Sequence, residues 1–359
     1  MAVSVKTGGV FTKDPGQRPG LYVRFIDRAI AAIAAGSRSK VATVKTVFNG
    51  GTAADGKVYR VTNMEQAYGL FGADNCKDIQ YLFIGGASEV VVVATSAVDS
   101  AGYSGALQKL ESYEFHVFVA PPNSAATLDS EIYTWLKTAK TNGLNFVCVF
   151  ADESAEGVVA TTKTKATAFK DEYAVFVGNG VKDAEGTTVD SSLYATYIAG
   201  LIAGTALDGS LTYKDVPFAE TITRFRTADV KDLLATGIFV TVMDGDAPRI
   251  EQGLTLGDTS AKEFNKIRTV RAKQAIIDDI SRAVNDNYIG KITNNPDGQI
   301  AVINAIKAYL ETLANGNVVA HNYTVELDKT QSSTGADLYI NVGVQFLDSI
   351  EYVYLTITV

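Results

Sequence analysis

The chain has 359 residues and a net charge of −8, with 47% apolar and 20% charged residues. These proportions are ordinary for a globular protein, and the length exceeds one domain of roughly 100–200 residues, so we expect two or three domains. The acidic balance disfavours nucleic acid as a partner, because neutralising phosphates requires a basic surface. Cys76 and Cys148 are too few for a disulfide framework, which favours a reducing compartment.

The beginning of the chain lacks the charged head and apolar stretch of a secretion signal. The longest apolar run near the start, Ala29–Ala35, is far shorter than the ~18 residues that a membrane span needs. We therefore expect synthesis in the cytoplasm and no direct membrane insertion, and a secreted adhesin is disfavoured.

The first 20 residues contain several glycines and prolines, which is typical of an extended arm rather than of a core element. Val3 and Val5 alternate with polar residues in a short strand pattern, and residues 21–26 form a second one. Because a single short strand cannot bury itself, the first strand has to join a sheet elsewhere.

Short apolar segments and helical segments alternate through the centre of the chain, after two strands within residues 41–61. This alternation is typical of a mainly parallel sheet that is covered on both faces. Strands are predicted at residues 89–95, 115–120, 145–151 and 173–177, and helices at 103–113, 126–141, 155–170 and 191–204. Gly200 and Gly204 are expected to allow close packing of the last of these helices.

The last third predicts two long helices and then strands. A capping box at residues 260–263 opens a helix that runs to about Asn287. Asp297 caps the second helix, which ends at Asn315–Gly316. Strands follow at residues 318–327, 337–346 and 352–359, and in the last one Val353, Leu355, Ile357 and Val359 share one face.

Residues Gly51–Lys57 match the G-x-x-x-x-G-K pattern of a phosphate-binding loop. Such a loop needs Ser or Thr next, to bind magnesium, and then a helix whose N-terminus faces the phosphates. Val58 follows instead and begins a predicted strand. We therefore interpret the segment as a hairpin turn in which Gly50 and Gly56 supply positive φ angles. A nucleotide-binding α/β enzyme that uses this loop is the alternative hypothesis.

No other pattern predicts catalysis or binding of a metal or cofactor. His116 lies in a predicted strand and His321 begins a late one, and neither is near a Cys or carboxylate pair with zinc-ligand spacing. Cys148 lies in an apolar strand and is interpreted as a buried small residue. We therefore expect no catalytic residues, no cofactor, no metal site and no enzymatic activity.

Lys262, Lys266 and Lys273 share one narrow face at the beginning of the long helix, at ~100° per residue. Positive charge at a helix N-terminus opposes the macrodipole, at roughly a few tenths of a kcal/mol per residue. A docking stripe for an acidic partner would explain this cost, and simple solvation of exposed lysines is an equal alternative.

Three segments together resemble a known family. They are residues 18–25 (RPGLYVRF), residues 210–256 and residues 263–298. They are similar to the contractile tail sheath proteins of myophages and R-type bacteriocins, and the resemblance extends over nearly the whole chain.

The resemblance implies a subunit that stacks in rings around an inner tail tube and contracts to drive the tube through a cell envelope. It implies contacts with copies of itself, with the tube, and with baseplate and tail-terminator proteins, in a particle released from bacteria by lysis. Its terminal arms, which carry Val3, Val5 and the last strand, would add strands to neighbouring subunits, and the lysine stripe would face the tube. Energy would be stored in a metastable extended lattice.

The resemblance and the patterns together predict an α/β and α+β protein with several domains. We expect an extended N-terminal arm (1–20), a small β-rich domain (21–88), a central, mainly parallel α/β domain (89–250), and a C-terminal domain of helices and antiparallel sheet with a terminal arm (251–359).

Overall fold

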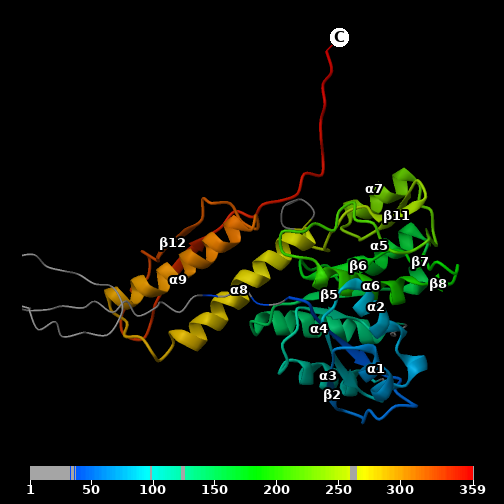
Figure 1. Cartoon of the computed structure of the whole chain (residues 1–359), viewed down its shortest axis with the longest axis horizontal. Helices are drawn as coiled ribbons and strands as arrows, with labels where there is room; N and C mark the ends of the chain where they lie inside the picture. Colours follow the sequence, from blue (N-terminus) through cyan, green and yellow to red (C-terminus); the bar gives the residue numbers. More distant parts are fainter. Residues whose placement is uncertain are drawn as a thin grey trace, which may run out of the picture.

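The computed structural model describes Ile33, Gly36 and residues 38–97, 99–122, 126–258 and 265–358. The predicted strands at Val3, Val5 and residues 21–26, together with Lys262 and Val359, lie outside these residues. The described part forms an α/β unit and a smaller helical unit, and the long helix α8 (Ile267–Asn287) connects them (Figure 1). Within this part, no helix is both long and apolar enough to span a membrane.

A six-stranded sheet forms the centre of the α/β unit, in the order β2-β3-β1-β4-β5-β6. The strand pairs are parallel except β2–β3, which confirms the mainly parallel sheet predicted from the alternating pattern. The strands are β1 (Lys40–Lys45), β2 (Val58–Val61), β3 (Glu89–Ala94), β4 (Val117–Val119), β5 (Val147–Ala151) and β6 (Ala174–Val177). Nearly all of their side chains are buried, because helices cover both faces.

Helices α2 and α6 pack together on one face of this sheet, and α3 and α4 lie on the other. The helices of the unit are α1 (Met64–Phe71), α2 (Lys77–Gly85), α3 (Ser100–Leu110), α4 (Ala126–Thr141), α5 (Val159–Thr167), α6 (Ser191–Gly204) and α7 (Thr227–Ala235), with short 3-10 turns at Ala73–Asn75 and Glu153–Ala155. A Cβ at Gly200 would lie 2.2 Å from the carbonyl oxygen of Leu82, so the predicted role of this glycine in close helix packing is confirmed.

The predicted boundary at residue 88 is wrong, because β1 and β2 belong to the central sheet rather than to a separate β-rich domain. The predicted hairpin between them is wrong too, since β3 lies between the two strands. Gly50 and Gly56 do adopt positive φ angles, of 87° and 71°. The connection from β1 to β2 is therefore a crossover that begins and ends in glycine turns.

Two small sheets extend the α/β unit. They consist of β7 (Val181–Lys182), β8 (Thr188–Val189) and β9 (Glu220–Thr221), and of β10 (Thr241–Asp244) and β11 (Ala247–Ile250).

The second unit contains most of α8, α9 (Pro296–Asn315) and the antiparallel strands β12 (Thr324–Leu327) and β13 (Ile340–Gly343). The long helix begins at Ile267 with Lys266 as its N-cap, so the predicted capping box at residues 260–263 does not cap it. Asn295, not Asp297, caps α9 by accepting a hydrogen bond from the Gly298 N–H.

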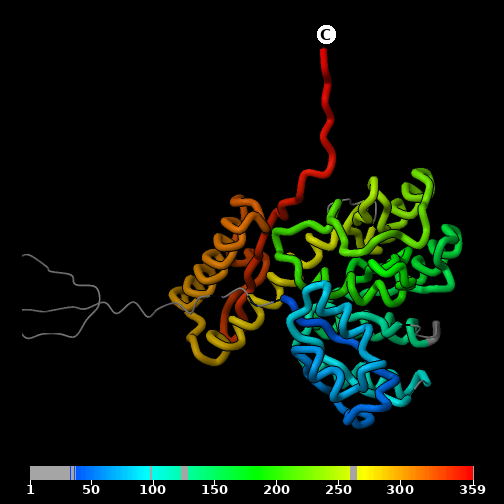
Figure 2. Tube along the Cα trace, turned by 45° about the vertical axis from the view of Figure 1, so that its right-hand side comes forward, coloured from blue at the N-terminus to red at the C-terminus, as the bar shows by residue number. Residues whose placement is uncertain are grey.

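The described residues form two apolar cores, and the division between them falls inside α8. Ile267 and Val270 belong to the core of the α/β unit, whereas Ala272 and Ile276 belong to the core of the helical unit. Ile33, far away in sequence, also packs into the second core. Figure 2 shows the two units and the C-terminal segment that leaves from between them.

Candidate interaction surfaces

The Gly51–Lys57 loop has none of the geometry of a phosphate site. Lys57 leads directly into β2, and no helix N-terminus follows. The backbone N–H of Gly56 donates to the carbonyl of Ala94 at 2.8 Å, and Asp55 accepts from the N–H of Ser96 at 2.6 Å. These contacts hold the loop against the edge of the sheet, and the nucleotide-binding alternative receives no support.

A small cleft of about 210 Å³ lies at the carboxyl ends of β1 and β4, where ligands bind in many α/β sheets. Lys45 and Asp78 form a buried ion pair in its wall, with the ammonium 2.7 Å from both carboxylate oxygens. Each charge in this pair is already satisfied by the other. No cluster of metal-ligating side chains occurs in the part of the chain that the structure describes.

The structure buries His116 and Cys148 and exposes His321. His116 is buried in the α/β unit, and burial, assisted by the charge of Arg38, lowers the pKa of its imidazole to about 3. Cys148 is fully buried, as predicted, and burial raises the pKa of its thiol. His321 is exposed, with its ring 3.7 Å from Glu311.

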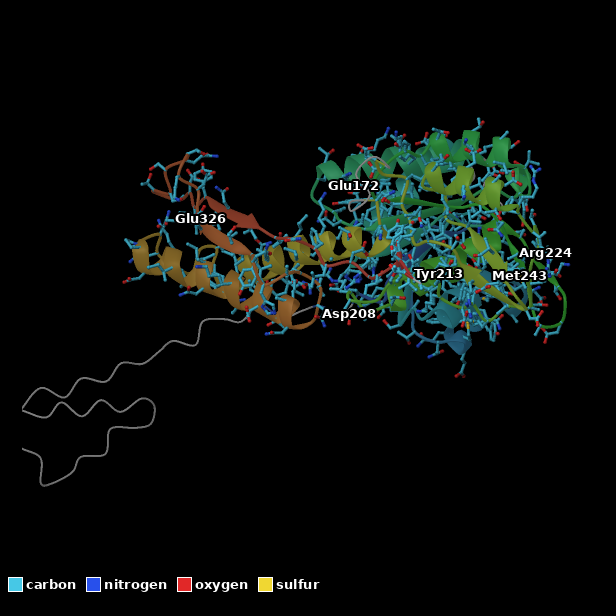
Figure 3. All side chains as sticks on the ribbon, turned by 90° about the horizontal axis from the view of Figure 1, so that it is seen from above. Glu172, Asp208, Tyr213, Arg224, Met243 and Glu326 are labelled. Atoms are coloured by element: carbon cyan, nitrogen blue, oxygen red, sulfur yellow. The ribbon has the colours of Figure 1, made fainter. Side chains whose placement is uncertain are left out.

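The two lysines of the predicted docking stripe that the structure describes are both paired with acids of the same chain. Lys266 contacts Asp348 and lies 2.8 Å from Glu351. Lys273 lies 3.1 Å from Glu172, which Figure 3 labels on the α/β unit. The proposed contact with a partner stays a prediction, and sequence reasoning missed these acidic partners because they are distant in the chain.

Arg271, on the same helix as Lys273, is buried. Its guanidinium donates to the carbonyls of Thr205 at 2.6 Å and Ala203 at 3.3 Å. These carbonyls lie at the C-terminal end of α6, where the helix dipole favours a cation. Burial lowers the pKa of Arg271 to about 10. The side chain therefore anchors α8 to the α/β unit.

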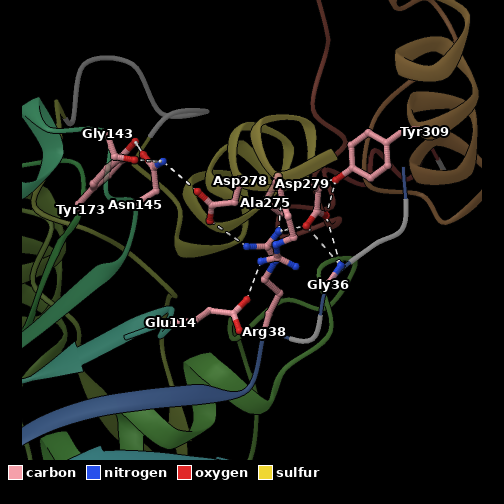
Figure 4. A network of polar contacts seen from close by, with 11 residues as sticks. Gly36, Arg38, Glu114, Gly143, Asn145, Tyr173, Ala275, Asp278, Asp279 and Tyr309 are labelled. Carbon is pink, nitrogen blue, oxygen red and sulfur yellow. Dashed lines mark hydrogen bonds and ion pairs between the residues drawn. The ribbon is translucent and has the colours of Figure 1, made fainter. Parts of the chain in front are cut away.

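Arg38 joins the two units through two neighbouring acids, of which Asp279 is buried and Asp278 is half-buried (Figure 4). Its guanidinium donates to Asp279 at 2.5 Å and to Asp278 at 2.9 Å, both on α8. The hydroxyl of Tyr309, on α9, donates to Asp279 at 2.7 Å, and the Asn145 amide donates to Asp278 at 2.9 Å. The segment that enters β1 is thus fixed to both long helices.

An apolar groove of about 480 Å³ lies in the helical unit, between the ends of α8 and α9 and strand β13. Alternate residues along the strand segment line it, with further apolar side chains contributed by the helices. The lining includes Ala336, Leu338, Ile340, Val342, Ile280, Val284, Ile289, Ile292, Val302 and Ile306. Several of them are exposed, among them Ile289 at 63%.

The C-terminal segment, residues 353–358, is extended and exposed (Figure 1). The exposed fractions of Val353, Leu355 and Ile357, the residues predicted to share a face, are 75–81%. Pairing with another strand is not found for these residues within the described chain. The molecule thus combines an apolar groove beside one strand with an exposed apolar segment of alternating pattern.

Two family descriptions match the chain. Residues 96–256 match the phage tail sheath protein central domain, and residues 259–359 match the phage tail sheath C-terminal domain. The chain belongs to the phage tail sheath protein family. As a member of that family, it is a structural subunit of a contractile tail sheath.

Individual relatives agree with this assignment. The tail sheath protein of Clostridium phage phiCD119 is 28% identical over 304 residues, which cover 81% of this chain and 80% of the relative. The crystal structure of a sheath tail protein from Desulfitobacterium hafniense has a TM-score of 0.73 at 16% identity, covering 94% and 99% of the two chains. The sheath of an extracellular contractile injection system, in its contracted state, has a TM-score of 0.76 at 15% identity, covering 96% and 98%.

Proposed function

We propose that this sheath protein polymerises by strand addition, with the C-terminal arm of one copy lying in the β13 groove of another. Strand addition satisfies the backbone groups of an unpaired strand and places its alternate side chains into a neighbouring surface. The arm carries Val353, Leu355 and Ile357 at every second position. The groove carries Leu338, Ile340 and Val342 at the same spacing, and this match is the observation that supports the proposal.

The exposure of the arm gives the proposal an energetic basis. An unpaired strand with large exposed apolar side chains is an aggregation hazard in a monomer. Burying one such side chain contributes about 1.5–3 kcal/mol, so three of them would stabilise a joint between subunits substantially. Val3 and Val5 of the N-terminal arm are proposed to form a second joint of the same kind.

The wider assembly follows from family membership. We propose that rings of this subunit surround an inner tube, contact a baseplate and a tail terminator, and contract without a chemical fuel. The protein is proposed not to be an enzyme, and to be made in the bacterial cytoplasm and released by lysis in a phage tail or bacteriocin particle. We also propose that the tube contacts Lys262, Lys266 and Lys273, and their positive charge and the family resemblance support this.

The strand-addition proposal is tested by mixing two variants. Leu355→Asp with Ile357→Asp disables the arm but leaves the groove, whereas Val342→Asp disables the groove but leaves the arm. Each variant alone is expected to give no tubes by electron microscopy, and an equimolar mixture is expected to give pairs that stop growing. Thr356→Asp with Thr358→Asp, on the opposite face of the arm, is the matched control. Normal tubes from the arm variant would refute the proposal.

A further inference from the structure

Residues 348–352 form the base of the C-terminal arm and contact the rest of the subunit, whereas residues 353–358 are exposed. The carboxylate of Glu351 contacts Lys266 and Thr212. The side-chain amide of Gln252 donates to the hydroxyl of Tyr352. Beyond Tyr352, residues 353–358 make no hydrogen bond to the rest of the described chain. The arm therefore has an anchored base and a free end, and the two meet between Tyr352 and Val353.

Lys266 is the centre of the anchor. Its ammonium contacts Asp348 and lies 2.8 Å from the Glu351 carboxylate, whose side chain is only 5% exposed. The other oxygen of Glu351 accepts a hydrogen bond from the Thr212 hydroxyl at 2.8 Å, and that hydroxyl accepts from the N–H of Gly253 at 3.2 Å. These contacts connect the arm to the α/β unit, although the arm follows a strand of the helical unit.

The two carboxylates of this anchor stabilise both the positive charge of Lys266 and the N-terminal end of α8. Lys266 is the N-cap of α8, a position where the helix dipole disfavours a cation and favours an anion. Asp348 and Glu351 bring two carboxylates to that helix end. Burial would lower the pKa of Lys266, but the hydrogen bonds and charges of the two carboxylates outweigh it and raise the pKa. The ammonium therefore stays charged while it is largely shielded from solvent.

A charged anchor of this kind can specify direction better than an apolar contact, because its hydrogen bonds require particular positions of the partners. Ordering the base of the arm before binding also reduces the entropy that is lost when the arm pairs with a neighbour. Lys266 is 15% exposed and already has two acidic partners. Its charge is therefore already engaged in holding the base of the arm.

We propose that Lys266, Glu351 and Thr212 form a clamp that sets the direction in which the C-terminal arm leaves the subunit, and so determines which neighbour receives it. The proposal rests on the strand-addition function proposed above. Lys266 is thus a positioning residue for assembly.

The direct test measures the direction of the arm in the monomer. Spin labels at Val353→Cys, just beyond the clamp, and Lys231→Cys, on α7, report a distance distribution, and the native Cys76 and Cys148 are buried. Tubes are excluded by adding Leu355→Asp and Ile357→Asp. We expect a narrow distribution with the native clamp and a distribution at least twice as broad in Lys266→Met and in Glu351→Gln. Lys273→Met, on the same helix but paired with Glu172, is expected to leave it narrow. An equally narrow distribution in the Lys266→Met protein would overturn the proposal.

The second test measures assembly with the arm sequence intact. Lys266→Met is expected to form tubes at least tenfold more slowly than the native chain, and the exchange Lys266→Glu with Glu351→Lys is expected to recover part of that rate. Normal tube formation by Lys266→Met would overturn the role in assembly even if the distance distribution broadens. If the arm variant Leu355→Asp with Ile357→Asp forms tubes, strand addition fails, and the distance measurement, repeated on dilute protein that gel filtration shows to be monomeric, still decides whether the clamp exists.

Discussion

Arg38 and Asp279 show how single buried charges hold the two units of this sheath protein together. The Arg38 side chain is 8% exposed and that of Asp279 is 1% exposed, so neither charge is well hydrated. Removing Asp279 leaves the buried Arg38 guanidinium with Asp278, which is 23% exposed, as its carboxylate partner, and losing a buried partner costs more than the intact pair contributes. The two residues are 241 positions apart in sequence, and their contact fixes the segment that enters β1 against α8.

We predict that Asp279→Ala lowers the free energy of unfolding by about 3 kcal/mol, because Arg38 loses one of its two carboxylate partners and Tyr309 loses its nearest acceptor. Urea denaturation of a monomeric variant measures this change. Arg249→Gln removes surface ion pairs with Asp215 and Asp244 and is the control, expected to leave the denaturation midpoint unchanged. A loss of less than 1 kcal/mol in Asp279→Ala would contradict the prediction.

His116 predicts a pH dependence of stability. Its pKa is about 3 in the folded chain and about 6.5 when unfolded, so the unfolded chain binds more protons between these values. Stability therefore falls as the pH drops through this window, by about 2 kcal/mol between pH 7 and pH 5 from this residue. In His116→Leu the loss over the same range should be smaller by that amount, as measured by urea denaturation at each pH. Equal pH dependence in both proteins would rule out this role.

At the scale of elements, the contact of α2 with α6 depends on glycines that let two helix backbones touch. A Cβ at Gly200 would clash with the backbone carbonyl of Leu82, which cannot move aside as a flexible side chain can. Gly105, inside α3, has no atom within 4 Å of the position of a Cβ and offers a comparison in another helix.

We predict that Gly200→Ala lowers the free energy of unfolding by about 2 kcal/mol or more, because the helices must separate. Gly105→Ala should leave it unchanged or raise it by up to about 1 kcal/mol, since alanine reduces the entropy of the unfolded chain. Thermal and urea unfolding of both variants measure the difference. If both substitutions change the free energy of unfolding by the same amount, close packing of α2 on α6 does not explain the effect of Gly200→Ala.

At the scale of the whole molecule, the proposed contraction without a chemical fuel requires the sheath to store its energy during assembly. Two packings of the same folded subunits, with the extended one trapped at higher free energy, satisfy this requirement, because interfaces between rigid bodies are bistable. The Arg38 network and the Arg271 anchor favour movement of each subunit as one body. The arms would keep neighbouring subunits connected while other contacts are exchanged.

We therefore predict that extended particles contract once, irreversibly and with release of heat, upon mild heating or addition of denaturant. Circular dichroism should show no change in secondary structure, and calorimetry should show the heat. Added ATP should have no effect, since Val58 stands where a phosphate loop needs a hydroxyl. Reversible contraction, or contraction that requires ATP, would refute stored energy.

Local patterns were sufficient to predict most elements of this chain and its family. The helices at residues 126–141 and 191–204 have the predicted bounds, because their ends depend on nearby residues. The alternation of strands and helices likewise predicted the parallel sheet. The period of two at the end of the chain predicts a strand; residues 353–358 are extended but form no strand within the described chain, and their pairing with a neighbouring subunit stays a prediction.

Pairings between distant segments were decided only by the tertiary structure. The side-chain period of a strand does not specify its neighbour, so β3 between β1 and β2 could not be predicted. Likewise, charge patterns placed Lys266 on a helix face but could not reveal Glu351, 85 positions away, as the acid beside it. Such contacts arise because folding brings remote segments into one place, where a buried charge requires a partner whatever its position in the chain.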